Sequence, residues 1–167
     1  MKQLLFFILF FSFSTLFPQD IETVLVEEVI DQLLKNKPNS IEDINTLFKK
    51  FRKNEKDVEL LIKKSNEASY LQGQLYGHNA LGRIYRDYSL FEKSLNEHRK
   101  AFEISQKTNN LLFEIKTLNS IGSVYRRQDD IRNALNYHQE ALEKGLTIEN
   151  PSIDIKKSIS ISQNSIG

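Results

Sequence analysis

The feature of this chain that most constrains its fold is a segment that returns after forty residues. Residues 79–86 read NALGRIYR, and residues 119–126 read NSIGSVYR. The similarity continues beyond them, because the two 28-residue windows that begin at Asn79 and Asn119 share nine identical positions. A repeat of roughly 20–50 residues indicates supersecondary units that stack on one another, since one unit alone cannot bury its apolar face. We therefore expect a repeat protein.

Each repeat unit has the apolar pattern of two amphipathic helices. Apolar residues recur three and four positions apart, the spacing that places side chains on one helix face. The alternation typical of strands is missing, and the chain has only six Gly and three Pro. The sequence therefore predicts an all-α fold, an α-α superhelix of stacked antiparallel helical hairpins. The repeated positions are Leu81, Ile84, Tyr85, Leu95, His98 and Ala101 in the first unit and Ile121, Val124, Tyr125, Leu135, His138 and Ala141 in the second.

A glycine occupies the middle of the first predicted helix in each unit, Gly82 in one and Gly122 in the next. Glycine inside a helix costs about 1 kcal/mol relative to alanine, so its recurrence requires a packing reason. We expect that reason to be close approach of the partner helix, whose Ala101 and Ala141 are correspondingly small.

The chain before the repeats, residues 20–53, is expected to form two helices that pack on or cap the array. Asp20 is the predicted N-cap of the first helix, and Ser40 is that of the second. The end of the second helix carries a cluster that we interpret as solvated cations complementing the helix macrodipole, namely Lys49, Lys50, Arg52 and Lys53. The predicted repeat region then covers 54–167, with a half-repeat at 54–78, repeats at 79–118 and 119–163, and a truncated repeat from 164.

Residues 1–19 have the features of a signal peptide. Lys2 precedes an apolar stretch that is shorter than the roughly 20 residues a membrane-spanning helix needs. Ser12 and Ser14 offer a small-x-small cleavage pattern. We therefore expect a periplasmic or secreted protein, and the alternative is a retained leader that anchors the chain in a membrane. The chain has no cysteine, which excludes disulfides.

The repeated residues resemble those of the tetratricopeptide repeats, in the variant whose units are nearer forty residues than thirty-four. The resemblance extends over 54–167 and rests on Leu81-Gly82-x-x-Tyr85 with Ala101, and on Ile121-Gly122-x-x-Tyr125 with Ala134 and Ala141. It implies a non-catalytic scaffold for a protein or peptide partner, with no cofactor. The departures from the family pattern are Ser94 in place of an alanine, Ser89 and Asp129 in place of a turn glycine, and Gln106 and Leu146 near its usual proline.

In the family that this chain resembles, side chains at set offsets from the glycine line a concave groove that holds a peptide or protein partner. The corresponding groove here would be basic and rich in amides, opposed only by Asp87, which favours an acidic ligand. The alternatives are that these are ordinary solvated side chains, and that the recurring Asn79, Asn119 and Asn164 tie one helix to the next. The predicted groove residues are Asn79, Arg83, Arg86, Lys116, Asn119, Ser123, Arg126 and Arg127.

Other classes of function have less support. A formal net charge of +1 and the lack of a basic recognition helix argue against nucleic acid as a ligand. The chain carries no motif for catalysis or for a cofactor. No third ligand recurs beside His98 and His138, which argues against a metal site. The rival hypothesis is the extracytoplasmic sensor arm of a histidine kinase or transcriptional regulator, truncated before its transmembrane and output domains; such a missing segment, or a retained leader, would bring the protein to a membrane.

Overall fold

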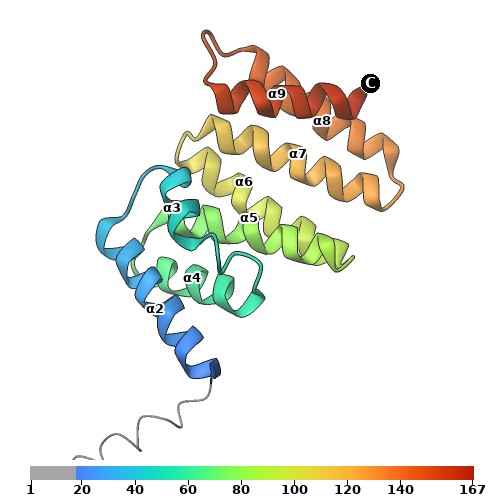
Figure 1. The fold of residues 1–167 in the computed structure, drawn as a ribbon. Helices are drawn as coiled ribbons and strands as arrows, with labels where there is room; N and C mark the ends of the chain where they lie inside the picture. The colour runs from blue at the N-terminus through green and yellow to red at the C-terminus, as the bar shows by residue number, and fades with distance from the viewer. Residues whose placement is uncertain (1–17) are drawn as a thin grey trace, which may run out of the picture.

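The computed structural model describes residues 18–167, with side chains from residue 24 onward. Within that range the chain forms eight helices and no strand, which confirms the predicted all-α fold (Figure 1). None of these helices is both long and apolar enough to cross a bilayer. They are α2 (Pro18–Asn36), α3 (Ile41–Phe48), α4 (Glu55–Glu67), α5 (Leu71–Asp87), α6 (Phe91–Lys107), α7 (Leu111–Arg127), α8 (Ile131–Leu146) and α9 (Ile153–Ile166).

The leader predicted over residues 1–19 lies outside the described residues, apart from its last two, which begin α2. This helix starts at Pro18, before the predicted N-cap Asp20. Proline suits the first turn of a helix because its missing N–H has no partner there and its φ is already helical.

The four helix-to-helix turns between α4 and α8 have the same geometry. Ser69, Ser89, Asn109 and Asp129 lie twenty residues apart, each with a positive φ of 50–60°. After each of them the next backbone N–H returns to the helix it has just left, as Leu90 N does to Tyr85 O at 2.8 Å. This is the hydrogen bond of a Schellman cap. One helix and one such turn therefore occupy twenty residues, and a hairpin occupies forty.

The helical hairpins begin earlier than the repeat boundaries predicted from sequence identity. The most extensive packing is between α5 and α6 and between α7 and α8, so the hairpins run over 71–107 and 111–146. The predicted unit boundaries 79–118 and 119–163 therefore fall inside α5 and α7. They were misplaced because the first turns of these helices, LQGQLYGH and LLFEIKTL, share only their first residue.

The third hairpin position is occupied by α9, which starts at Ile153 rather than near the predicted repeat start at 164. It packs on both α7 and α8, as α7 packs on α5 and α6. Successive hairpins thus stack as a tetratricopeptide-like solenoid. Leu95 is covered by Ile121 and Val124 of α7, whereas Leu135 is 37% exposed.

The predicted packing reason for the mid-helix glycines is right, but the neighbour is a histidine rather than an alanine. A Cβ added at Gly82 would lie 2.7 Å from the ring of His98, and one added at Gly122 would lie 2.8 Å from the ring of His138. Both histidines are buried. In each hairpin, therefore, the imidazole ring of the second helix packs directly against the glycine backbone of the first. Ala101 and Ala141 occupy other buried positions.

Burial of these histidines makes the fold sensitive to acid. Burial, together with the neighbouring Arg86 and Arg83, lowers the pKa of His98 to about 3. Burial and Arg126 also lower the pKa of His138. A histidine with a lowered folded-state pKa contributes stability above its unfolded pKa of about 6.5, and this stability is lost as the pH falls toward the folded value.

We expect the unfolding free energy to fall by about 2 kcal/mol on going from pH 7.5 to pH 5 through His98 alone, since one pKa unit corresponds to about 1.4 kcal/mol. Urea unfolding at the two pH values measures this loss. His98→Leu should reduce the loss by about that amount. An equal pH dependence in the variant would contradict the assignment of a neutral buried imidazole.

The two N-terminal helices extend the apolar core of the array. Ile30 and Leu33 of α2 and Ile44 and Phe48 of α3 are fully buried, and they share one core cluster with residues of α4 and α5, Leu61 among them. Ser40 caps α3 as predicted, its Oγ accepting from Asp43 N at 3.4 Å. The helix ends at Phe48, however, so the cations at 49–53 lie in the following turn and not in its last helical turn.

Candidate binding groove

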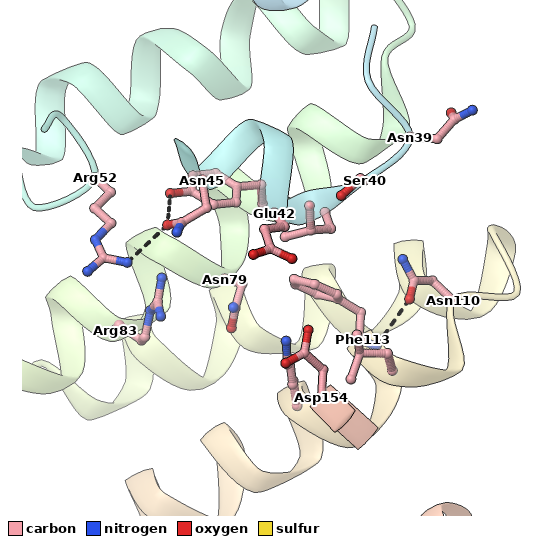
Figure 2. Close-up of a pocket in the computed structure, with 14 residues that line it drawn as sticks. Asn39, Ser40, Glu42, Asn45, Arg52, Asn79, Arg83, Asn110, Phe113 and Asp154 are labelled. Atoms are coloured by element: carbon pink, nitrogen blue, oxygen red, sulfur yellow. Dashed lines mark hydrogen bonds between the residues drawn. The ribbon is translucent and has the colours of Figure 1, made fainter. Parts of the chain in front are cut away.

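A cavity of about 520 Å³ lies between α3, α5, α7 and the start of α9 (Figure 2). Helices α5, α7 and α9 are the first helices of successive hairpins, so the cavity lies on the face that these helices share, and α3 adds a wall from outside the repeats. The lining residues are Asn39, Ser40, Ile41, Glu42, Asn45, Arg52, Tyr76, Asn79, Arg83, Asn110, Leu112, Phe113, Lys116 and Asp154.

Two arginines form the basic end of the cavity. Figure 2 shows Arg52, from the turn after α3, beside Arg83 of α5. Asn45 Oδ1 accepts from Arg52 Nη1 and from the Tyr76 hydroxyl, each at 3.0 Å. Neither guanidinium forms an ion pair with a carboxylate of the described residues.

Burial and charge both act on Arg83. Burial lowers the pKa of its guanidinium, Tyr76 and Asp87 raise it, and the neighbouring Arg52 and Arg86 lower it. Arginine nevertheless stays charged in proteins. The basic end therefore holds partly buried positive charge that these protein groups do not neutralise.

The other part of the cavity is apolar and acidic. The Phe113 ring is 3% exposed, with Lys116 Nζ 5.6 Å from its centroid, and Asn110 Oδ1 accepts from Phe113 N at 3.2 Å. Glu42 and Asp154 also line this space. The sequence analysis predicted Asp87 as the only carboxylate near the basic residues of the groove. That prediction was wrong, because two further carboxylates, Glu42 and Asp154, line the cavity itself, away from its basic end.

Residues 71–144 match the tetratricopeptide repeat family. The matched segment begins with α5 and ends in α8, so it covers the two hairpins that form most of the array. No curated protein and no solved structure matches the chain. Tetratricopeptide repeats are scaffolds that typically mediate protein interactions, and the match supports that class of function here.

The structure brings together three of the eight predicted groove residues of the helical array. Asn79, Arg83 and Lys116 line the cavity. Arg86 lies in a smaller adjoining hollow that shares Arg83. The other four, Asn119, Ser123, Arg126 and Arg127, do not line the cavity.

Asn119 serves the alternative role, tying one helix to the next. Its Nδ2 donates to Ser158 O at 3.0 Å, and its Oδ1 accepts from Ser162 Oγ at 3.0 Å and lies 2.8 Å from His138 Nδ1. Asn119 is 5% exposed. This side chain thus joins α7 to α8 and α9 and is not available to a ligand.

Asn79 occupies the same position in the hairpin of α5 and α6, but its side-chain oxygen has no such hydrogen bonds. It is 8% exposed, and its Oδ1 has no hydrogen-bond partner among the described residues. Thr117 of α7 stands 45 residues before Ser162, as Asn119 stands 45 before Asn164, and the Thr117 hydroxyl also has no hydrogen-bond partner among the described residues. Asn79 and Asn119 therefore share a repeat position but differ in their hydrogen bonds. Asn164, the third asparagine of the series, is exposed.

Several lining residues were not predicted from the sequence. Arg52 was interpreted as a solvated cation, and Asn45, Tyr76 and Glu42 were not singled out. Asn45 and Tyr76 are 31 residues apart in the chain, and α3 has no counterpart in the repeats, so no periodic signal connects them. Asn45 is one of four polar residues in α3, with Glu42, Asp43 and Thr46, so the sequence of this helix alone did not mark it.

A second, more open hollow of about 680 Å³ lies between α4, α5 and α6. Glu97 is its principal charged group, with His78 Nδ1 at 2.6 Å and Lys100 Nζ at 2.7 Å. Burial raises the pKa of Glu97, but the hydrogen bonds from His78 and Lys100 outweigh it and hold the pKa below its ordinary value. The described residues contain no group of three His, Asp or Glu side chains placed to hold a metal ion.

Proposed function

We propose that this chain is a non-catalytic scaffold of the tetratricopeptide type that holds a segment of a partner protein in the cavity between α3, α5 and α7. The observation that carries the proposal is that polar and charged side chains of the cavity lack partners among the described residues. Arg52 and Arg83 have no carboxylate partner in the described residues, and the Asn79 carboxamide oxygen accepts no hydrogen bond there. Groups of this kind gain most from a ligand, because leaving them unsatisfied is costly.

The partner segment should be polar and carry an acidic group. An anion beside Arg52 and Arg83 would form charge-assisted hydrogen bonds with their guanidiniums. A backbone N–H of the segment would suit Asn79 Oδ1, and an apolar side chain would cover Phe113. These contacts come from the turn after α3, from α5 and from α7, so an extended segment fits them better than a compact group.

The proposal is tested by blocking the cavity and comparing it with the same changes elsewhere. Leu112→Asp with Lys116→Glu alters two cavity residues of α7, and Leu135→Asp with Arg132→Glu makes the same changes on exposed positions of α8. We expect the wild type and the α8 variant to retain a partner in affinity capture from the producing cells. The α7 variant should capture at least tenfold less of this partner.

Circular dichroism of both double variants serves as the control for folding. Equal capture by two folded variants would show that the partner binds elsewhere, and would reject the cavity as its site.

The cellular location of the protein is also part of this proposal. A periplasmic or secreted location, with the partner met there, rests on the leader features of residues 1–19. We place the scaffold function ahead of the sensor-arm alternative, because the cavity is a property of residues 39–154 and needs no output domain.

A further inference from the structure

The basic end of the cavity continues into a small hollow of about 160 Å³. The turn after α3 contributes Arg52 and Lys53, and α5 contributes Arg83, Arg86 and Asp87. The apolar part of its lining is Ala80 and Ile84, both buried. Four cations and one carboxylate thus surround a space large enough for a small ion.

The one carboxylate of the hollow is already paired. Asp87 Oδ1 accepts from Arg86 Nε at 3.2 Å and Nη2 at 3.1 Å, and Arg127 Nη2 lies 3.7 Å from it. Asp87 also points largely into solvent, with its side chain 60% exposed. The charges of Arg52, Lys53 and Arg83 therefore remain without a counter-charge from the lining residues.

The hollow is not a repeated feature of the hairpins. Forty residues after Arg83 stands Ser123, and Arg127 replaces Asp87. The cations of this hollow come from the turn after α3 and from α5, so the preference for an anion belongs to the junction between the N-terminal helices and the first hairpin.

We propose that this hollow binds a phosphoryl group, as a phosphate monoester or inorganic phosphate, held by Arg52, Arg83 and Arg86. A carboxylate would neutralise only one of the unpaired cations, whereas a phosphoryl group carries about −1.5 to −2 charge at neutral pH and offers three acceptor oxygens. Guanidinium groups match such oxygens in pairs. When the group is part of a larger ligand, the inference rests on the proposed function, because the rest of that ligand would occupy the adjoining cavity.

Calorimetric titration of the whole chain with inorganic phosphate at pH 7.5 tests the inference without any partner. We expect one phosphate to bind per chain, at least tenfold more tightly than acetate at matched ionic strength. Arg83→Gln and Arg52→Gln should each weaken phosphate binding at least tenfold. Arg132→Gln makes the same change at an exposed site on α8 and should leave the affinity within twofold.

Equal phosphate affinity in Arg83→Gln, Arg52→Gln and Arg132→Gln would overturn the inference, and so would binding no tighter than that of acetate. Because Arg52 lies in a turn, its variant keeps the test valid if Arg83→Gln does not fold. Loss of partner capture in the Leu112→Asp, Lys116→Glu variant with unchanged phosphate binding would separate the two proposals. Unchanged capture with loss of phosphate in Arg83→Gln would support the hollow and reject the cavity.

A phosphoserine peptide distinguishes the two sources of the phosphoryl group. Tighter binding of the peptide than of inorganic phosphate supports a phosphorylated ligand that also fills the cavity, and equal binding supports a site for free phosphate. The affinity for the peptide should fall several-fold between pH 7.5 and pH 5, because the second pKa of a phosphate monoester is about 6. An affinity that stays constant over this range would overturn the preference for a dianion.

Discussion

Gly122→Leu is expected to lower the unfolding free energy by about 3 kcal/mol or more, a large part of the 5–15 kcal/mol typical of a domain. The side chain would have to enter space filled by the His138 ring, which a Cβ alone would approach to 2.8 Å. His138 cannot move away easily, since it is 1% exposed and its Nδ1 is held by Asn119. Chemical denaturation measures the loss.

A second substitution shows whether the ring is the cause. His138→Ala removes the obstacle, so Gly122→Leu should cost at least about 1.5 kcal/mol less in that background than in the wild type, as expected for residues in contact. Gly167→Leu is the control for the effect of the leucine side chain itself, because a Cβ there would lie 3.8 Å from Gln163 O, an ordinary contact distance. A native-like unfolding transition in Gly122→Leu would contradict the assigned packing of α7 against α8.

The second large effect is expected from Asn119→Ala, which should lower the unfolding free energy by about 3 kcal/mol. The substitution removes the hydrogen bonds of Asn119 to Ser158 O, Ser162 Oγ and His138 Nδ1. Ser162 Oγ still donates to Ser158 O at 3.1 Å, but His138 Nδ1 is left buried without a partner, which costs about 1–3 kcal/mol in addition to the lost bonds. Because these bonds link α7 to α8 and α9, hydrogen exchange in α9 should accelerate most.

The first hairpin supplies the matched control, since Asn79 stands at the same repeat position. Asn79→Ala removes no hydrogen bond of its Oδ1, and should cost no more than about 1 kcal/mol. It should instead weaken partner binding. Equal losses of stability in Asn79→Ala and Asn119→Ala would refute the division between a free and an engaged asparagine.

The repeat fold could be predicted because it follows from local rules that recur. Turns at Ser89 and Asp129 adopt the left-handed conformation that a glycine often fills, although neither is glycine, because the cap bonds around them are complete. Ser94 fits where the family prefers alanine, since its hydroxyl donates to Gly82 O at 2.7 Å. These substitutions leave the forty-residue period intact, so the hairpins were recognisable.

The groove could be predicted only where it lies on the repeated helices. Arg83 and Lys116 follow from their offsets to the glycines, whereas Arg52 and Asn45 come from a segment without a repeat. Asn119 was misassigned because its engagement depends on serines of α9, forty residues away. A side chain at a repeated position can bind a ligand or a neighbouring helix, and only the packed structure distinguishes the two.

Hydrogen–deuterium exchange of the chain with and without its captured partner tests the central claim most directly. Binding in the cavity predicts added protection in α3, in the C-terminal half of α5 around Arg83, and in the first turns of α7, with little change in α6 and α8. Protection confined to α6 and α8 would contradict the account, because it would place the partner on the opposite helices of the hairpins.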